Sequence, residues 1–148
     1  MIYGIQKTPL KQFKDDRGKV MHMLKSTDPY FEKFGEIYFS WINPGKIKAW
    51  SKHLHMTMNY AVPMGNIKVV FFDDRPNSNT SGKIEEYYLG EDDYYLLTIP
   101  PNIWYGITVV GNVAAMIANC ANIPHDPAEI IRMDPFDPEI PYSWHANY

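Results

Sequence analysis

Two histidines, His53 and His55, are the residues of this sequence best placed to do chemistry. They lie two positions apart in WSKHLHMTMNYAVPMG, residues 50–65, a run that predicts a strand. Side chains two apart on a strand share a face, so we expect both imidazoles to point into one cavity. A neutral imidazole can remove a proton near pH 7, which makes His53 a candidate general base and His55 a candidate substrate contact. The alternative is that His53 is packed and hydrogen-bonded in the core.

A second segment, IPPNIWYG at residues 99–106, also has the pattern of a strand, a proline-rich turn and a second strand. Tyr105 within it is a candidate acid or enolate ligand, because a phenol on a facing strand can reach a bound substrate. Tyr60 is a second candidate. Since the chain contains eleven tyrosines, a purely structural role for Tyr105 is the alternative. The two segments facing each other predict a pocket inside a small barrel.

The elements that must hold these residues are short strands separated by turns. Strongly β-forming runs with intervening turn residues occur at 36–42, 46–50, 66–72, 84–90, 94–100 and 107–110. The apolar run at 113–121 fits a helix or a strand, and its neighbours favour a strand. We therefore expect an all-β jelly roll in one domain over residues 1–148, with two antiparallel sheets around a cavity. The proline-rich tail should wrap across it, and Asp126 should cap a single helical turn.

Composition excludes several functional classes. A net charge of -3 offers no cationic surface for nucleic acid or an anionic membrane. No stretch is as long as a membrane span, and the first residues lack the pattern of a signal peptide, so we expect a cytoplasmic protein. With Cys120 as its one cysteine, the chain has no internal disulfide.

Several motifs follow one another in a specific order. They are DDRG at 15–18, WSKH at 50–53, DDRPNSNTSG at 73–82, IPPNIWYG at 99–106 and DPFDPEIPYSW at 134–144. Over about residues 16 to 144 the chain thereby resembles the dTDP-4-dehydrorhamnose 3,5-epimerase family of RmlC-like cupins. The resemblance implies a double-stranded β-helix barrel that works without a cofactor, as a homodimer. The implied substrate is a nucleotide-activated 4-keto-6-deoxy sugar of surface-polysaccharide or deoxysugar biosynthesis.

The resemblance also implies roles for individual residues. His53 is the base that removes the proton next to the ketone. Arg17 belongs to the region that binds the diphosphate, sometimes across a dimer contact, and an ion pair with Asp15 or Asp16 within the turn is the alternative. Trp50 stands where a phosphate-binding arginine is usual, and it either stacks on the substrate or belongs to the core.

Other positions depart from the family pattern. Asn119 appears at the place of the acid tyrosine, where it can orient a substrate but cannot protonate it. His125 takes the place of a stacking aromatic residue at the pocket edge, and Met58 is nearest to the place of the family lysine. A single-centre epimerase or a ketoisomerase therefore fits the sequence as well as a double epimerase does.

Two further functions remain open from the sequence. One is a binding module for sugar nucleotides that has lost its catalytic groups. The other is a metal-dependent cupin, in which His53 and His55 would be two of four ligands. Because Asn59 and Tyr105 occupy the other two ligand places, we expect no metal.

Overall fold

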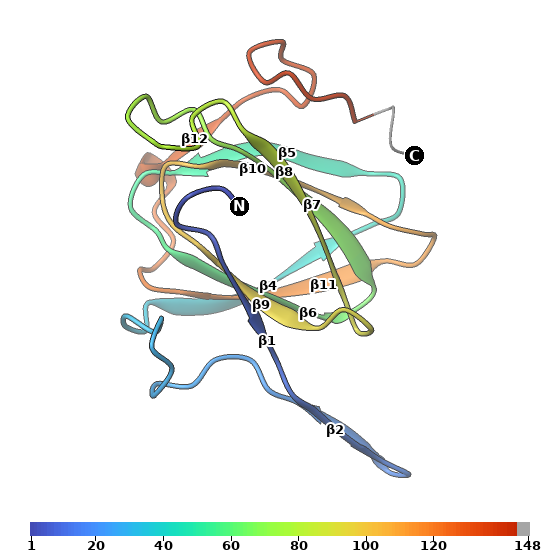
Figure 1. Cartoon of the computed structure of the whole chain (residues 1–148). Helices are drawn as coiled ribbons and strands as arrows, with labels where there is room; N and C mark the ends of the chain where they lie inside the picture. Colours follow the sequence, from blue (N-terminus) through green and yellow to red (C-terminus); the bar gives the residue numbers. More distant parts are fainter. Residues whose placement is uncertain (145–148) are drawn as a thin grey trace.

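The computed structural model describes residues 1–144, which form short strands and one turn of 3-10 helix (Figure 1). The elements in chain order are β1 (Gln6–Pro9), β2 (Gln12–Asp15), β3 (Gly18–Met21), β4 (Glu36–Ile42), β5 (Ile47–His53), β6 (Met58–Met64), β7 (Asn66–Phe72), β8 (Ile84–Gly90), β9 (Tyr95–Ile99), β10 (Trp104–Val109), β11 (Ala115–Ala121), η1 (Pro127–Glu129) and β12 (Ile130–Arg132). No helix in this part of the chain is long and apolar enough to cross a membrane.

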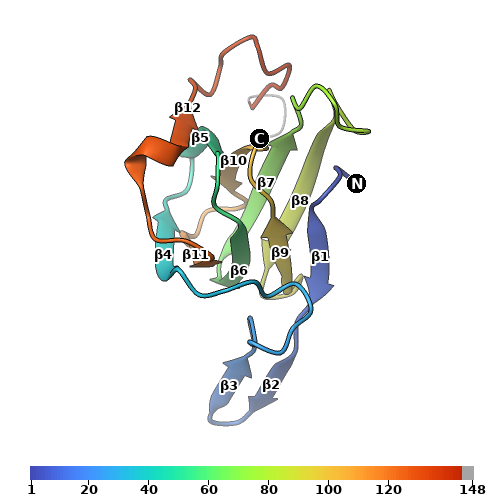
Figure 2. The ribbon, with the colours of Figure 1, turned by 90° about the vertical axis from the view of Figure 1, so that its left-hand side faces the viewer.

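Two antiparallel five-stranded sheets face each other and enclose the core. The first sheet has the order β1-β9-β6-β11-β4 and the second the order β12-β5-β10-β7-β8. The prediction of an all-β jelly roll is confirmed, and so is the strand expected near residues 113–121, which is β11. Strands β2 and β3 form a separate hairpin that projects away from the sandwich (Figures 1 and 2).

Apolar side chains fill the space between the sheets, and the tail covers the outer face of the second sheet. The inner core includes Val69, Phe71, Leu97 and Ile99, all fully buried. A smaller outer core consists of Trp50, Val70, Trp104, Ile140 and Trp144. Gly106 is required at this contact, because a Cβ atom there would lie 2.6 Å from the Trp144 ring and 2.7 Å from the Ala49 methyl group. The tail thus packs across the barrel as expected, and Asp126 caps η1.

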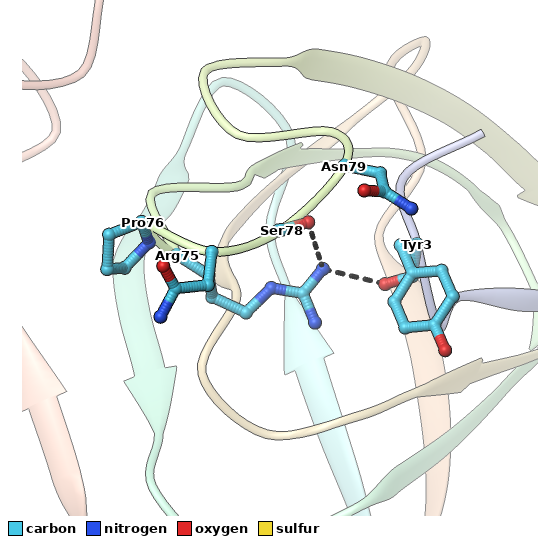
Figure 3. A pocket seen from close by; sticks show the side chains of 6 residues that line it. Tyr3, Arg75, Pro76, Ser78 and Asn79 are labelled. Carbon is cyan, nitrogen blue, oxygen red and sulfur yellow. Dashed lines mark hydrogen bonds between the residues drawn. The ribbon is translucent and has the colours of Figure 1, made fainter.

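The loop after β7 is organised around the buried carboxylate of Asp73. Arg75 donates to Asp73 through Nε at 2.8 Å and Nη2 at 2.9 Å, and Ser78 and Thr80 donate at 2.7 and 2.6 Å. Arg75 Nη2 also donates to the Tyr3 carbonyl at 2.7 Å (Figure 3). Burial alone would raise the pKa of Asp73, but these hydrogen bonds hold that pKa well below its usual range. Arg75 therefore locks the loop against Asp73 and the N-terminal segment.

We expect Asp73→Asn to lower the free energy of unfolding at pH 7 by about 3 kcal/mol, because Arg75 loses its buried partner. A carboxylate whose folded pKa is depressed stabilises the protein above its unfolded pKa, near 4, and this contribution fades as the pH falls toward the folded value. The difference between wild type and Asp73→Asn should therefore shrink from pH 7 to pH 2 in urea titrations. Asp16→Asn, on the exposed hairpin turn, is the matched control with no expected effect.

Candidate functional site

A cavity of about 400 Å³ opens between the two sheets. Its size is typical of a small-molecule site. Three phenols and two cations stand out among its lining residues. The first sheet contributes Tyr38, Ser40 and Tyr60, and the second contributes Ile47, Lys48, Ala49, Trp50, Ser51, Tyr105, Ile107 and Arg132.

His53 lies directly behind the Tyr105 wall of this cavity. It is the last residue of β5, and its side chain is 4% exposed. Its Nε2 atom is 3.2 Å from the Tyr105 hydroxyl oxygen, and the two rings stack with centroids 5.8 Å apart and an interplanar angle of 7°. Tyr105 lines the cavity while His53 does not, so Tyr105 is the member of this pair that faces the cavity.

The other nitrogen of His53 contacts a buried carboxylate, Glu129. Glu129 is 3% exposed, and its Oε1 atom is 2.7 Å from His53 Nδ1. Its Oε2 atom accepts from the backbone N–H groups of Leu54 at 2.9 Å and His55 at 3.2 Å. Burial raises the pKa of Glu129, but the hydrogen bonds from His53 and from the two backbone N–H groups outweigh burial and lower it. When Nδ1 donates to the Glu129 carboxylate, Nε2 is the nitrogen that faces the Tyr105 hydroxyl and can accept from it.

The Tyr105 phenol is held from several directions. The Tyr60 and Tyr105 rings meet edge to face with centroids 6.3 Å apart. Burial raises the pKa of Tyr105 to about 12, an effect that Tyr38 reinforces and that hydrogen bonds from Tyr60 and Ser51 partly offset. Tyr105 is therefore a neutral phenol at physiological pH.

On the opposite wall, Asn119 supports Tyr38 rather than the cavity itself. Asn119 is 0% exposed, and its Oδ1 atom accepts from the Asn59 backbone N–H at 3.0 Å. Its Nδ2 atom donates to the Tyr38 hydroxyl oxygen at 2.9 Å. Burial raises the pKa of Tyr38, and the hydrogen bond from Asn119 offsets part of that rise. Asn119, predicted as a substrate contact, lies one layer behind the cavity.

Two cations, Lys48 and Arg132, line the cavity on the side of the second sheet. Both residues are exposed, and neither forms an ion pair with a carboxylate in residues 1–144. Lys48 Nζ donates to the Trp41 carbonyl at 2.5 Å and to Ser40 Oγ at 3.4 Å. Arg132 is close enough to lower the pKa of Tyr105 by its charge. The cavity therefore offers positive charge to an anionic ligand.

The prediction that His53 and His55 share a strand face is wrong. Strand β5 ends at His53, and His55 is exposed in the following loop, where only its backbone contacts Glu129. Trp50 is 1% exposed, and its Nε1 donates to the Pro135 carbonyl at 3.2 Å. Trp50 therefore belongs to the outer core and contributes to the cavity only as part of its wall.

Arg17 and His125 lie away from the cavity lining of their own chain. Arg17 follows β2 at the hairpin turn and pairs with Asp15 at 2.6 Å, the ion pair considered as the alternative. His125 is exposed, and its backbone N–H donates to Glu36 at 2.7 Å.

Sequence reasoning missed Glu129, Lys48, Arg132 and Tyr38. Glu129 follows a Pro-Ala pair in a turn and is 76 positions from His53, so no local pattern links the two. As for metals, residues 1–144 contain no group of three or more His, Cys, Asp or Glu side chains that could hold an ion.

Known proteins similar to this chain act on sugars or contribute to glycan synthesis. The chain is 31% identical over 150 residues to the spore coat polysaccharide biosynthesis protein SpsL of Bacillus subtilis, covering 100% of this chain and 99% of that protein. It is 30% identical over 143 residues to a probable low-salt glycan biosynthesis epimerase of Haloferax volcanii, covering 95% and 88%. No family model matches the chain.

Solved structures include similar proteins as well. A dTDP sugar isomerase from Desulfovibrio desulfuricans has a TM-score of 0.96 and 44% sequence identity, with 99% of this chain and 94% of that one covered. A dTDP-4-dehydrorhamnose 3,5-epimerase from Bacillus anthracis shares the fold, with a TM-score of 0.83, 18% identity, and coverage of 97% and 89%.

Proposed function

Because the chain belongs to the dTDP-4-dehydrorhamnose 3,5-epimerase family of RmlC-like cupins, we propose that it epimerises or isomerises a nucleotide-activated 4-keto-6-deoxy sugar. One observation carries this proposal. The buried series Glu129, His53 and Tyr105 ends in a phenol on the wall of a cavity between the sheets. This arrangement supports proton removal next to a ketone. Synthesis of a surface glycan, in the cytoplasm, is the setting we propose.

In the proposed reaction, His53 is the base and acts through Tyr105. The Tyr105 oxygen takes the proton from the carbon next to the ketone while its own proton moves to His53 Nε2, 3.2 Å away. The electrons of the C–H bond form the enolate. Glu129, paired with Nδ1, stabilises the imidazolium that results. Since the pKa of Tyr105 is about 12, its phenolate would not persist at pH 7, and a coupled transfer to His53 avoids that species.

We propose that Lys48 and Arg132 bind the diphosphate of the substrate. The sugar occupies the cavity between Tyr38 and Tyr105, and the diphosphate lies beside the Lys48 and Arg132 side chains. The planar guanidinium of Arg132 suits two phosphate oxygens at once, and the Lys48 ammonium supplies a compact charge. Trp50 forms part of the wall, and Asn119 acts indirectly by holding Tyr38.

A second copy of the chain completes the proposed enzyme. Strand β4 is an edge strand, and it exposes three large apolar side chains at alternate positions, Ile37 at 50%, Phe39 at 65% and Trp41 at 50%. An exposed apolar face beside an unpaired edge is typical of a subunit interface, and a twofold contact would bury it in both copies. The β2–β3 hairpin, whose turn contains Arg17, projects away from the sandwich (Figure 2), and it is the segment we propose to reach the substrate of the partner.

We expect Trp41→Glu to convert a dimer into a monomer, because the new carboxylate would be buried without a partner. Sedimentation velocity on both proteins measures this change. Tyr88→Glu is the matched control, since Tyr88 is exposed on β8 in the other sheet. A wild-type protein that sediments as a monomer at all concentrations would contradict the proposed interface.

The proposed activity is tested with a thymidine-diphosphate 4-keto-6-deoxyglucose and proton NMR of the sugar. We expect catalytic amounts of the protein to convert it into an isomeric keto sugar with the diphosphate intact. Calorimetry with the same compound separates the alternative function. Binding without any conversion would identify a sugar-nucleotide binding module and would contradict the enzyme.

A further inference from the structure

We propose that Tyr38 is the proton donor on the face of the sugar opposite Tyr105, and that Asn119 positions it for this role. The inference rests on the proposed function and adds a residue and a stereochemical outcome to it. Proton removal by Tyr105 and proton delivery by Tyr38 would invert the configuration of one carbon.

The two phenols belong to opposite walls of one cavity. Tyr38 lies on β4 of the first sheet and Tyr105 on β10 of the second, and both line the same space of about 400 Å³. A flat ring held between the sheets therefore has a phenol on each face. An enolate formed by loss of a proton toward Tyr105 would expose its other face to Tyr38.

The hydrogen bonding of Tyr38 leaves its proton available. Tyr38 and Asn119 are direct partners across the β4–β11 pair. The Asn119 carbonyl oxygen accepts from the Asn59 backbone, which fixes the amide so that Nδ2 donates to the Tyr38 oxygen at 2.9 Å. The phenol oxygen is thus the acceptor, and its own O–H can point into the cavity. The same Nδ2 donor would stabilise the phenolate left after proton transfer.

The third phenol of the cavity, Tyr60, is not equivalent to Tyr38. Tyr60 is 4% exposed, and its ring meets Tyr105 edge to face, so it packs against the phenol that an opposing donor would have to face across the sugar. Tyr38 is more exposed and has a buried donor behind it instead of an acceptor. The geometry therefore distinguishes an opposing donor, Tyr38, from a supporting neighbour, Tyr60.

Protons and electrons balance in the transfer from Tyr38 to the enolate carbon. The O–H bond of Tyr38 breaks, and its proton binds the enolate carbon from the side of the first sheet. The electrons of the enolate C=C bond form the new C–H bond, and the ketone C=O is restored. The Tyr38 phenolate then takes a proton from water at the cavity mouth, and the proton held by His53 returns through Tyr105 to water.

The test is Tyr38→Phe, assayed in deuterated water with thymidine-diphosphate 4-keto-6-deoxyglucose. We expect wild type to give the inverted sugar with deuterium at the inverted carbon. In Tyr38→Phe, inversion should fall about 100-fold or more, while deuterium still enters the starting sugar from the Tyr105 side. Tyr88→Phe, which removes an exposed hydroxyl from the other sheet, should match wild type.

Asn119→Leu tests the positioning role. This variant should also lower the ratio of inversion to exchange, and the double variant with Tyr38→Phe should be no slower than Tyr38→Phe alone, because both changes remove one function. A residue that only supports the fold would lower inversion and exchange together.

Three results would overturn the proposal. Inversion by Tyr38→Phe at the wild-type rate would exclude Tyr38 as donor and leave the enzymatic function intact. A wild-type product formed without inversion at any carbon would also exclude Tyr38 as donor and would leave the enzymatic function intact. A wild-type protein that catalyses neither exchange nor conversion would overturn the function as well.

Discussion

Replacing Tyr105 by phenylalanine is expected to slow conversion of the 4-keto sugar by about 1,000-fold, near the upper part of the range for a lost acid–base group. The variant removes the oxygen that links the cavity to His53 and leaves the imidazole behind a phenyl ring. The measurement is the initial rate of product formation at saturating substrate.

Tyr60→Phe is the matched control for Tyr105→Phe. Tyr60 packs edge to face against Tyr105 from β6 of the first sheet, so this control removes a neighbouring hydroxyl and keeps the link to His53. We expect it to slow the reaction by less than about tenfold, because no group of the Glu129–His53–Tyr105 series is removed. Full activity in Tyr105→Phe would mean that His53 reaches the substrate without a relay.

Replacing His53 by asparagine should have an effect of similar size, about 1,000-fold or more, because the variant removes the imidazole that takes the Tyr105 proton in the proposed reaction. Glu129→Gln should be milder, about 10- to 100-fold, because the imidazole stays in place but loses the carboxylate that orients it and stabilises its charged form. Initial rates of the three proteins, with circular dichroism to verify folding, provide the measurement.

The neighbouring histidine offers a direct control for His53→Asn. His55 is exposed after the end of β5 and contacts Glu129 only through its backbone, which His55→Asn retains. That variant should have the wild-type rate. Equal losses in the two histidine variants would support the arrangement expected from the sequence, with both imidazoles in one cavity, and would contradict the site described above.

The comparison of the two histidines explains why the fold was predictable and part of the site was not. Alternating apolar residues and turn signals are local, and they predicted most strands and the jelly roll. The sequence motifs identified His53 and Tyr105 as candidates, and the structure places their side chains in contact. The position at which β5 ends depends on the contact of Glu129 with the following backbone, and this contact is not encoded in residues 50–65.

The residues that sequence reasoning missed share this dependence on tertiary structure. Glu129 reaches His53 from a turn near the end of the chain, and Arg132 reaches the cavity from the edge strand that follows. Asn119, in contrast, was identified from the sequence, but its contact was not. An amide cannot donate a catalytic proton, and only the register between β4 and β11 reveals that Asn119 holds Tyr38.

The central claim is that this protein removes a proton from the carbon next to a sugar ketone. The most direct measurement is deuterium incorporation from deuterated water into thymidine-diphosphate 4-keto-6-deoxyglucose, followed by the loss of ring proton signals in NMR. We predict rapid loss with wild type and none above the protein-free background with His53→Asn. Equal, background-level incorporation with both proteins would contradict the claim.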